Sequence, residues 1–200
     1  KNVAINAGAG ADSVYTYADN VTASGDAGND TLRNWGNNSS IFGGAGVDSI
    51  YNGGDSVVVE GGTDNDVINN FGNNVSIDSG DGADTIDSAG QYVSINGGKG
   101  NDYIYIYTNG YNQTIDGGEG KDSIYSGGQD ISISGGAGDD YIYIYSNATN
   151  QTVNGGEGKD SIYSGGQNVS ISGGAGDDYL YVYSNSTNQT VNGGEGNDSI

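Results

Sequence analysis

Cysteine, methionine, proline and histidine are all absent from this chain of 200 residues, and only five of its residues are basic. Without cysteine there is no disulfide framework and no thiolate metal site. Because histidine is absent as well, ordinary zinc, haem and iron–sulfur ligation is excluded. The remaining metal ligands are carboxylate, carbonyl and hydroxyl oxygens, which suit hard cations.

The charge balance excludes further classes of function. Aspartate and glutamate number 26, and the formal net charge is −21. A chain without a basic patch is not expected to bind nucleic acid or an anionic membrane surface. No apolar run approaches the ~18 residues that a membrane-spanning helix needs. No histidine or cysteine is available for general-base or thiol catalysis, so we expect no enzyme in this segment.

Glycine is abundant, with 39 residues, and an aspartate recurs in one register behind glycine-rich hexamers such as 43–48. Most steps between these aspartates are 18 residues and three are 20. A fixed period of this length is typical of repeat architectures. We call the set the aspartate column: Asp12, Asp30, Asp48, Asp66, Asp84, Asp102, Asp122, Asp140, Asp160, Asp178 and Asp198.

Each repeat divides into two halves of nine residues, for example 43–51 and 52–60. Each half is a turn followed by a short strand whose side chains alternate between the two faces. Ile50, Val57 and Val59 are predicted to point inward. The sequence therefore predicts an all-β fold, a parallel β-roll or flattened two-sheet β-solenoid with about 18 residues per coil and about 11 coils.

The repeat pattern runs through the whole chain, so we expect residues 1–200 to form a single continuous array. Residues 1–96 hold coils of 18 residues, and residues 97–200 carry a super-repeat of 38 residues that spans two coils. Its copies 117–154 and 155–192 differ at five positions, three of which are apolar exchanges at predicted inward positions. Because the pattern is cut at both ends, we interpret the chain as a fragment of a longer protein.

Stacked coils would place the column carboxylates about 4.8 Å apart, where two unit charges repel by about 3–4 kcal/mol at an effective dielectric constant of 20. Cations between the coils would remove this repulsion. Two stacked turns can supply the six or more oxygens that calcium prefers. Besides the aspartate column, the candidate metal ligands are the carbonyls of the second and fourth turn glycines: Gly44, Gly46, Gly98, Gly100, Gly118, Gly120, Gly136, Gly138, Gly156, Gly158, Gly174 and Gly176. The alternative is a metal-free solenoid whose aspartates cap the turns by hydrogen bonding.

The pattern Gly-Gly-x-Gly-x-Asp-x-apolar-x resembles the calcium-binding nonapeptide of the repeats-in-toxin (RTX) family. Seven of the eleven turns match its six-residue core, and the other four keep the closing aspartate. The resemblance implies a β-roll with calcium between coils, secretion, and folding outside the cell. The second half of each coil lacks the closing aspartate, as in 126–131, so we predict several calcium ions along one edge only, and polar ladders along the other.

Two outward faces are candidate binding surfaces. Tyr105, Tyr125, Tyr143, Tyr163 and Tyr181 are predicted to stack on one face, either as a stabilising ladder or as a surface for carbohydrate, a cell-surface receptor or a neighbouring copy of the chain. On the other face a hydroxyl column runs from Thr22 to Thr190 and is interrupted at Val58. Such a rank can order water, which leaves ice binding open. Asn-x-Ser/Thr sequons along this column are candidate glycosylation sites.

The expected function is that of an extracellular, calcium-binding structural region in a large secreted or cell-surface protein: an adhesin stalk, a spacer or a filament body. One alternative is the secretion and folding module of an RTX toxin or hydrolase whose catalytic domain lies outside this segment. A second alternative is a self-assembling extracellular filament subunit, because the ends of a solenoid expose unpaired strands.

Overall fold

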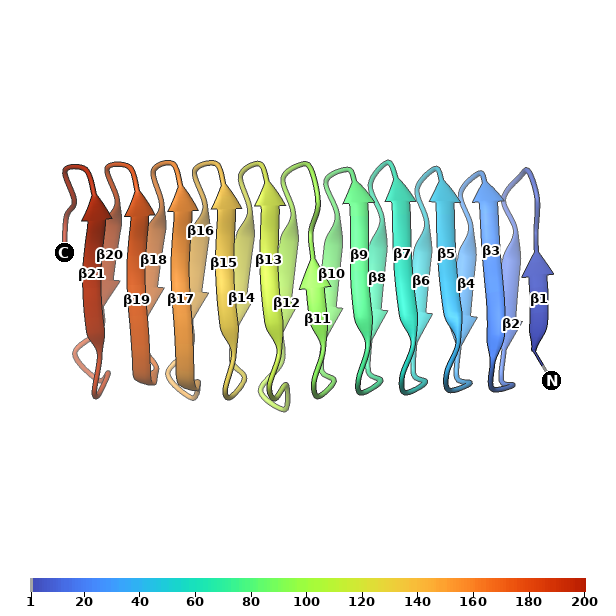
Figure 1. Ribbon diagram of the computed structural model, residues 1–200, viewed down its shortest axis with the longest axis horizontal. Coiled ribbons are helices and arrows are strands. Elements are labelled where there is room, and N and C mark those ends of the chain that lie inside the picture. Colours follow the sequence, from blue (N-terminus) through green and yellow to red (C-terminus); the bar gives the residue numbers. More distant parts are fainter. Residues whose placement is uncertain (1) are drawn as a thin grey trace.

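The chain forms a flattened solenoid of two parallel β-sheets, seen in a computed structural model that describes residues 2–200 (Figure 1). The chain advances by one coil at a time, so its two ends lie at opposite ends of the long axis. None of the described residues forms a helix, and no apolar helix of membrane-spanning length occurs among them. The predicted fold class, an all-β solenoid of about 18 residues per coil, is confirmed.

The odd-numbered strands form one sheet of eleven strands, and the even-numbered strands form a second sheet of ten. The first sheet contains β1 (Val3–Asn6), β3 (Val21–Ala27), β5 (Ser40–Ala45), β7 (Val58–Thr63), β9 (Ser76–Asp81), β11 (Ser94–Asn96), β13 (Thr114–Glu119), β15 (Ser132–Ala137), β17 (Thr149–Glu157), β19 (Gln167–Ala175) and β21 (Thr190–Glu195).

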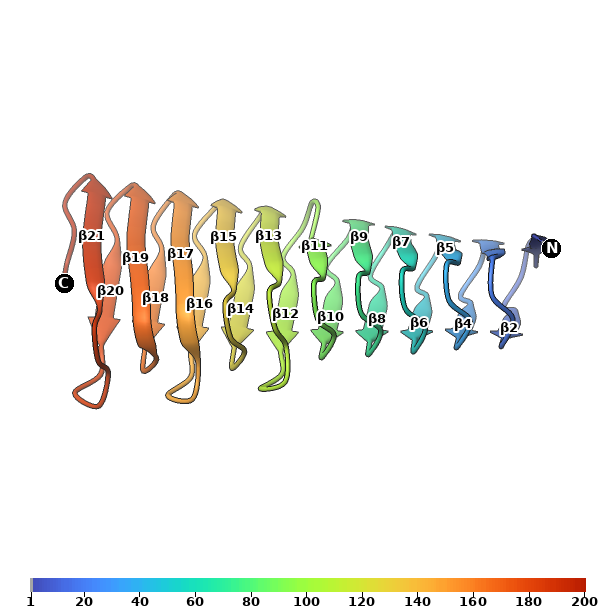
Figure 2. The same ribbon diagram turned by 60° about the horizontal axis from the view of Figure 1, so that its bottom comes forward.

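The second sheet lies behind the first in Figure 2. It contains β2 (Ser13–Thr16), β4 (Thr31–Asn34), β6 (Ser49–Asn52), β8 (Val67–Asn70), β10 (Thr85–Ser88), β12 (Tyr103–Ile106), β14 (Ser123–Ser126), β16 (Tyr141–Ile144), β18 (Ser161–Ser164) and β20 (Tyr179–Val182).

Every pairing within the sheets is parallel and in register with the sequence period. Ser88 pairs with Ile106, a separation of 18 residues, whereas Gln91 pairs with Tyr111, a separation of 20. The two additional residues of that coil therefore lie between Ile106 and Tyr111. This turn lies at the edge opposite the aspartate column. A turn can absorb such an insertion without changing which face each strand residue occupies.

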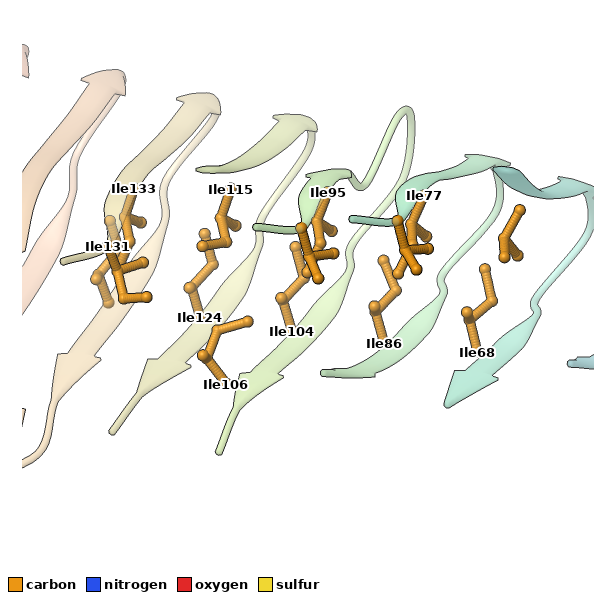
Figure 3. Packing of buried hydrophobic residues seen from close by; sticks show 14 of the residues in the cluster. Ile68, Ile77, Ile86, Ile95, Ile104, Ile106, Ile115, Ile124, Ile131 and Ile133 are labelled. Atoms are coloured by element: carbon orange, nitrogen blue, oxygen red, sulfur yellow. The ribbon is translucent and has the colours of Figure 1, made fainter. Parts of the chain in front are cut away.

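The core is a thin layer of branched apolar side chains between the sheets (Figure 3). The predicted inward residues Ile50, Val57 and Val59 are buried, and branched apolar residues of both sheets, mostly isoleucine, continue the layer. Each inward residue pairs with its equivalent in the next coil, as Ile104 does with Ile124. The sheets are thus held together by one column of apolar contacts per strand position, without a second layer behind it.

We predict that Ile124→Ala lowers the free energy of unfolding by about 2–5 kcal/mol, because it leaves a cavity in this layer. Ile124→Val should cost only about 0.5–1.5 kcal/mol, since it removes a single methylene group. Urea denaturation in excess calcium measures both. Equal effects of the two substitutions would contradict a close-packed core at this position.

Candidate metal centre

The aspartate column lies in the turns that connect each strand of the first sheet to the next strand of the second. Asp122, for example, follows the end of β13 and immediately precedes β14. The column members from Asp30 to Asp178 are buried, with no more than 2% of their surface exposed. The carboxylates therefore do not splay into solvent, and each must be stabilised inside the turn.

One carboxylate oxygen of each aspartate is satisfied by the preceding coil. The backbone N–H of Asp12 donates to Oδ1 of Asp30 at 2.7 Å, and the same bond recurs along the column up to Asp178 and Asp198, at 3.0 Å. Turn capping of this kind is what the metal-free alternative predicts. It involves only Oδ1, so it does not explain the second oxygen.

The second oxygen, Oδ2, is buried without a hydrogen-bond partner in ten members of the column, from Asp12 to Asp178. A buried acceptor that has lost its water and gained no donor costs about 1–3 kcal/mol, and more when it is charged. The same cost recurs in successive coils, and a ligand that supplies positive charge to Oδ2 would remove it.

Each Oδ2 faces a space lined by backbone oxygens. A methyl group on Gly61 would lie 2.6 Å from Oδ2 of Asp66, and one on Gly97 would lie 2.6 Å from Oδ2 of Asp102. The same methyl groups would also collide with the carbonyl oxygen of the equivalent residue in the next coil, which is Gly117 in the case of Gly97. The first glycine of the turn thus leaves open a cradle into which a carboxylate and a carbonyl oxygen both point.

The first glycine is absent from the sequence-based set of ligands, although it recurs as regularly as the others. Glycine stands at this position in nine turns: Gly25, Gly43, Gly61, Gly97, Gly117, Gly135, Gly155, Gly173 and Gly193. Its role depends on the direction of its missing side chain, which the spacing alone does not reveal. The structure adds it to the candidate site.

The predicted second and fourth glycines border the same gaps between coils. The second glycines have positive φ, such as 106° at Gly118, and the carbonyl of Gly98 accepts a hydrogen bond from the N–H of Glu119 in the next coil at 2.8 Å. The carbonyl of the fourth glycine Gly100 lies against the α-carbon of Gly120. Both kinds of carbonyl therefore face the following coil, as Oδ2 does.

These oxygen atoms are suitable ligands for a hard divalent cation. The gaps are lined mainly by carboxylate and backbone carbonyl oxygens, and a flexible cage of this composition suits calcium better than magnesium. Among residues 2–200 no three acidic side chains cluster around one point. Backbone carbonyls must therefore supply most of the ligands. Asp Oδ2 and the turn carbonyls of two consecutive coils are the groups that would hold the ion.

The degraded turns keep the backbone course of the intact ones. Asp26 and Asp64 stand where other turns have glycine, with φ values of 72° and 76°. Aspartate tolerates this left-handed region better than most residues. Ser79 replaces the first glycine of its turn, and its hydroxyl donates to the carbonyl of Gly97 at 2.6 Å. The cradle beside Asp84 is thus occupied by a side chain.

Burial raises the pKa of the column carboxyls from Asp48 to Asp160. The pKa values of Asp66, Asp102 and Asp140 rise to about 7, and that of Asp160 to about 6. Loss of solvent is the largest cause, and neighbouring carboxylates of the column add to it. The N–H bond from the preceding coil opposes the shift of the pKa without cancelling it.

The opposite edge is closed by hydrogen bonds alone in several coils. Asn34 Nδ2 donates to Oδ1 of Asn52, and Asn52 Nδ2 donates to Oδ1 of Asn70, at 2.8 and 2.9 Å. These buried amides also donate to the glycine carbonyls of their own turns. The polar ladder predicted for this edge, from stacked amides of Asn73, Gln91, Gln129 and Gln167, is represented by one bond, in which the backbone N–H of Gln91 donates to Oδ1 of Asn73 at 2.9 Å.

The predicted tyrosine column is in register along the second sheet, since Tyr105, Tyr125, Tyr143, Tyr163 and Tyr181 pair in successive strands. From Tyr125 to Tyr181 the ring centroids of successive members lie 6.1–6.4 Å apart. The ring of Tyr105 instead packs against Tyr107 and Tyr145. All five residues are therefore in register in the backbone, but the stack of rings begins only at Tyr125.

The fold and the site together define a parallel β-roll with repeated oxygen-lined gaps along one edge. A family model described as the RTX calcium-binding nonapeptide repeat (4 copies) matches residues 6–39, 36–59, 78–105, 107–142, 154–182 and 183–200. The chain belongs to this RTX calcium-binding repeat family, as its hexamers predict. A comparison with curated proteins finds no match.

A solved structure with a related fold is the X-ray crystal structure of a hyperactive, Ca²⁺-dependent, β-helical antifreeze protein from an Antarctic bacterium. Its sequence is 31% identical, and the two structures superpose with a TM-score of 0.78. The alignment covers 98% of this chain and 65% of that protein. The family and this similarity both support calcium as the ion.

In the absence of calcium, we predict that the fold becomes more stable as the pH falls from 8 to 5. The folded pKa values of Asp66, Asp102 and Asp140 are about 7, whereas an unfolded aspartate titrates near 4. Between these values the folded chain binds more protons, so stability rises as the pH falls. The β-sheet signal of calcium-free protein in circular dichroism, recorded at several pH values between 8 and 5, measures the folded fraction. A folded fraction that is no larger at pH 5 than at pH 8 would contradict the prediction.

Proposed function

We propose that this chain is an extracellular structural segment whose stiffness depends on calcium, part of a larger secreted or surface protein. The observation that carries the proposal is the unpartnered Oδ2 atom in the column from Asp12 to Asp178. Each of these atoms makes the stacking of two coils conditional on a cation. Calcium is abundant outside cells, so such a segment would fold after export.

A rod-like role follows from the shape of the segment. Eleven coils at about 4.8 Å per strand give a rod of roughly 50 Å from 200 residues. Each coil contacts only its neighbours, so further coils would lengthen the rod without changing its cross-section. This supports a spacer, an adhesin stalk or a filament body. Residues 2–200 repeat the same oxygen-lined gap from coil to coil and bring no His or Cys together with a carboxylate, so we propose a non-enzymatic role.

The alternative role as a secretion and folding module of a toxin or hydrolase uses the same calcium-dependent folding. It differs from the structural role only in that the rest of the protein would contain a catalytic domain. The filament alternative depends on the strands at the two ends, β1 and β21, which present unpaired edges in this segment.

Removal of calcium with a chelator at pH 8 should abolish the β-sheet signal in circular dichroism and increase the radius of gyration. The column carboxylates would then repel one another in the buried turns. An unchanged spectrum after complete calcium removal would overturn the proposal.

A matched pair of variants tests which residues bind the calcium. Asp140→Asn keeps the Oδ1 acceptor for the N–H of Asp122 but replaces Oδ2 with an amide group that cannot bind a cation.

Asp140→Asn should therefore bind at least one calcium ion fewer than the wild type in isothermal titration. The control is Asp116→Asn, which removes one negative charge from an exposed position on the outer face of β13. Its calcium stoichiometry should be unchanged. Equal losses of calcium in the two variants would show that net charge, not the column, governs binding.

A second candidate function is antifreeze activity, which one observation on this chain favours. The hydroxyl column forms an exposed rank, one residue per coil, in which Thr114, Ser132 and Thr152 pair in register. A rank of left-handed residues, mostly asparagine, runs beside it, and Asn168 Nδ2 donates to Oδ1 of Asn150 at 3.0 Å. The rank mixes serine with threonine and includes Val58, so it is less uniform than a repeated threonine surface.

If this second function is present, calcium-loaded protein should lower the freezing point below the melting point of ice. Thr152→Tyr should reduce that gap several-fold, because a bulky ring interrupts the flat rank while the core stays intact. Nanolitre osmometry measures the effect. If the freezing point and the melting point of ice do not differ in the presence of calcium-loaded protein, antifreeze activity is excluded for this segment.

A further inference from the structure

The outer face of the second sheet carries a dense patch of tyrosine in its C-terminal half. Eleven tyrosines lie on this face between Tyr103 and Tyr183, at outward positions of β12, β14, β16, β18 and β20 and of the turns that follow them. We call this set the tyrosine face. Strands β12, β16 and β20 each contribute two rings and the turn after each adds a third, whereas β14 and β18 contribute one ring, flanked by serine and glycine.

The tyrosine face carries no charge on a chain with a net charge of −21. Between Tyr103 and Tyr183 its outward positions hold only tyrosine, serine and glycine. The acidic residues of this stretch lie in the turns and on the other sheet, and Asp87 of β10, which pairs with Tyr105, borders the face at its first strand. A charge-free surface offers no ion pair to a basic partner. The surrounding acidic residues would repel an acidic polymer such as nucleic acid or an anionic polysaccharide. The partner that fits this face is therefore uncharged.

The tyrosine rings pack against one another in the unbound protein. The centroids of Tyr143 and Tyr183 lie 6.1 Å apart across the coil that carries Gly165, and those of Tyr105 and Tyr145 lie 6.1 Å apart across the coil that carries Gly127. The column from Tyr125 to Tyr181 links these pairs. Each ring is packed on its neighbours, so binding would order few additional torsions, and its entropic cost would be low.

The shape of the face selects an extended partner. Strands β12, β14, β16, β18 and β20, which follow one another in the second sheet of Figure 2, pair in register and so repeat the tyrosine positions along the solenoid. A flat array buries little of a small molecule but can contact an extended polymer at each coil. Tyrosine combines an apolar ring with a hydroxyl group, which suits a partner whose surface alternates C–H groups with hydroxyls.

We propose that the tyrosine face binds neutral polysaccharide, with the polymer lying along the solenoid across the rings of β12 to β20. Neutral polysaccharides are uncharged, extended and rich in both C–H and hydroxyl groups, so they match the charge, the shape and the chemistry of the face. This inference goes beyond the proposed structural role and requires only the calcium-loaded fold.

The chain itself provides a variant that should fold. In the row that contains Tyr103, Tyr141 and Tyr179, the intervening coils carry Ser123 and Ser161. The triple variant Tyr103→Ser, Tyr141→Ser, Tyr179→Ser leaves serine at every position of this row. Serine already occurs in the row, so the variant should fold. The matched control is Tyr92→Asn, Tyr111→Ser, which removes an exposed ring pair with centroids 5.9 Å apart, outside the second sheet. Asparagine suits the φ of 56° at Tyr92.

The experiment measures the partition of calcium-loaded protein onto microcrystalline cellulose and chitin, with an alginate gel as the acidic comparison. The wild type and the control should be retained on at least one neutral polymer and not on alginate. The triple variant should bind at least tenfold more weakly. Circular dichroism and calcium stoichiometry confirm that each variant is folded.

Three results would overturn the proposal: no retention of the wild type on either neutral polymer, equal retention of the triple variant, or an equal loss in the control. Sedimentation at increasing concentration distinguishes the competing partner. A wild-type dimer that the triple variant abolishes, together with no retention on either polymer, would assign the face to a second copy of this chain. Loss of folding in the absence of calcium tests the structural role separately, because these binding assays are performed with calcium present.

Discussion

The structure depends on how each column aspartate divides its two carboxylate oxygens. Oδ1 accepts the N–H of the preceding coil and so fixes the distance between the coils, as Asp122 and Asp140 show at 2.8 Å. Oδ2 remains buried and unpartnered beside the next coil. The hydrogen bond alone would fix the register but leave a column of uncompensated charge inside the turn. A cation alone would neutralise that charge but not set the direction of stacking. The two requirements fall on one side chain, which explains why the closing aspartate stays when the rest of the hexamer changes.

The degraded turns show which parts of the hexamer are replaceable. Asp26 and Asp64 substitute for glycine because the requirement there is a left-handed backbone, which aspartate can meet. The first position has a different requirement, namely empty space in front of Oδ2. Ser79 breaks that requirement and places its hydroxyl on the carbonyl of Gly97, an oxygen that lines the cradle in other turns. The glycines of one hexamer are therefore conserved in the repeat for different physical reasons.

The sequence period predicts the fold, the inward residues such as Ile50 and Val59, and the edge that carries the aspartates, because register in a solenoid follows directly from spacing. It does not predict which carboxylate oxygen is capped, since that depends on the direction of the turn N–H groups. It does not predict the buried ladder of Asn34 either. A signal for that ladder exists, because asparagine recurs at 18 residues with glycine two positions later. The packing of Tyr105 away from its column is a rotamer choice, and no spacing encodes it.

The two edges of the solenoid respond differently to the surroundings. The buried amides of Asn34 and Asn52 are neutral and hydrogen-bonded to one another, so the buried part of that edge needs no ion. The aspartate edge carries charges that only protons or cations can balance, and it does so in every coil. Because each coil is bound mainly to its neighbours, loss of the ions would weaken all the interfaces together and not only one end. The outer faces take no part in this balance. Their side chains can therefore vary freely, and the recognition of partners can change without altering the dependence of the fold on calcium.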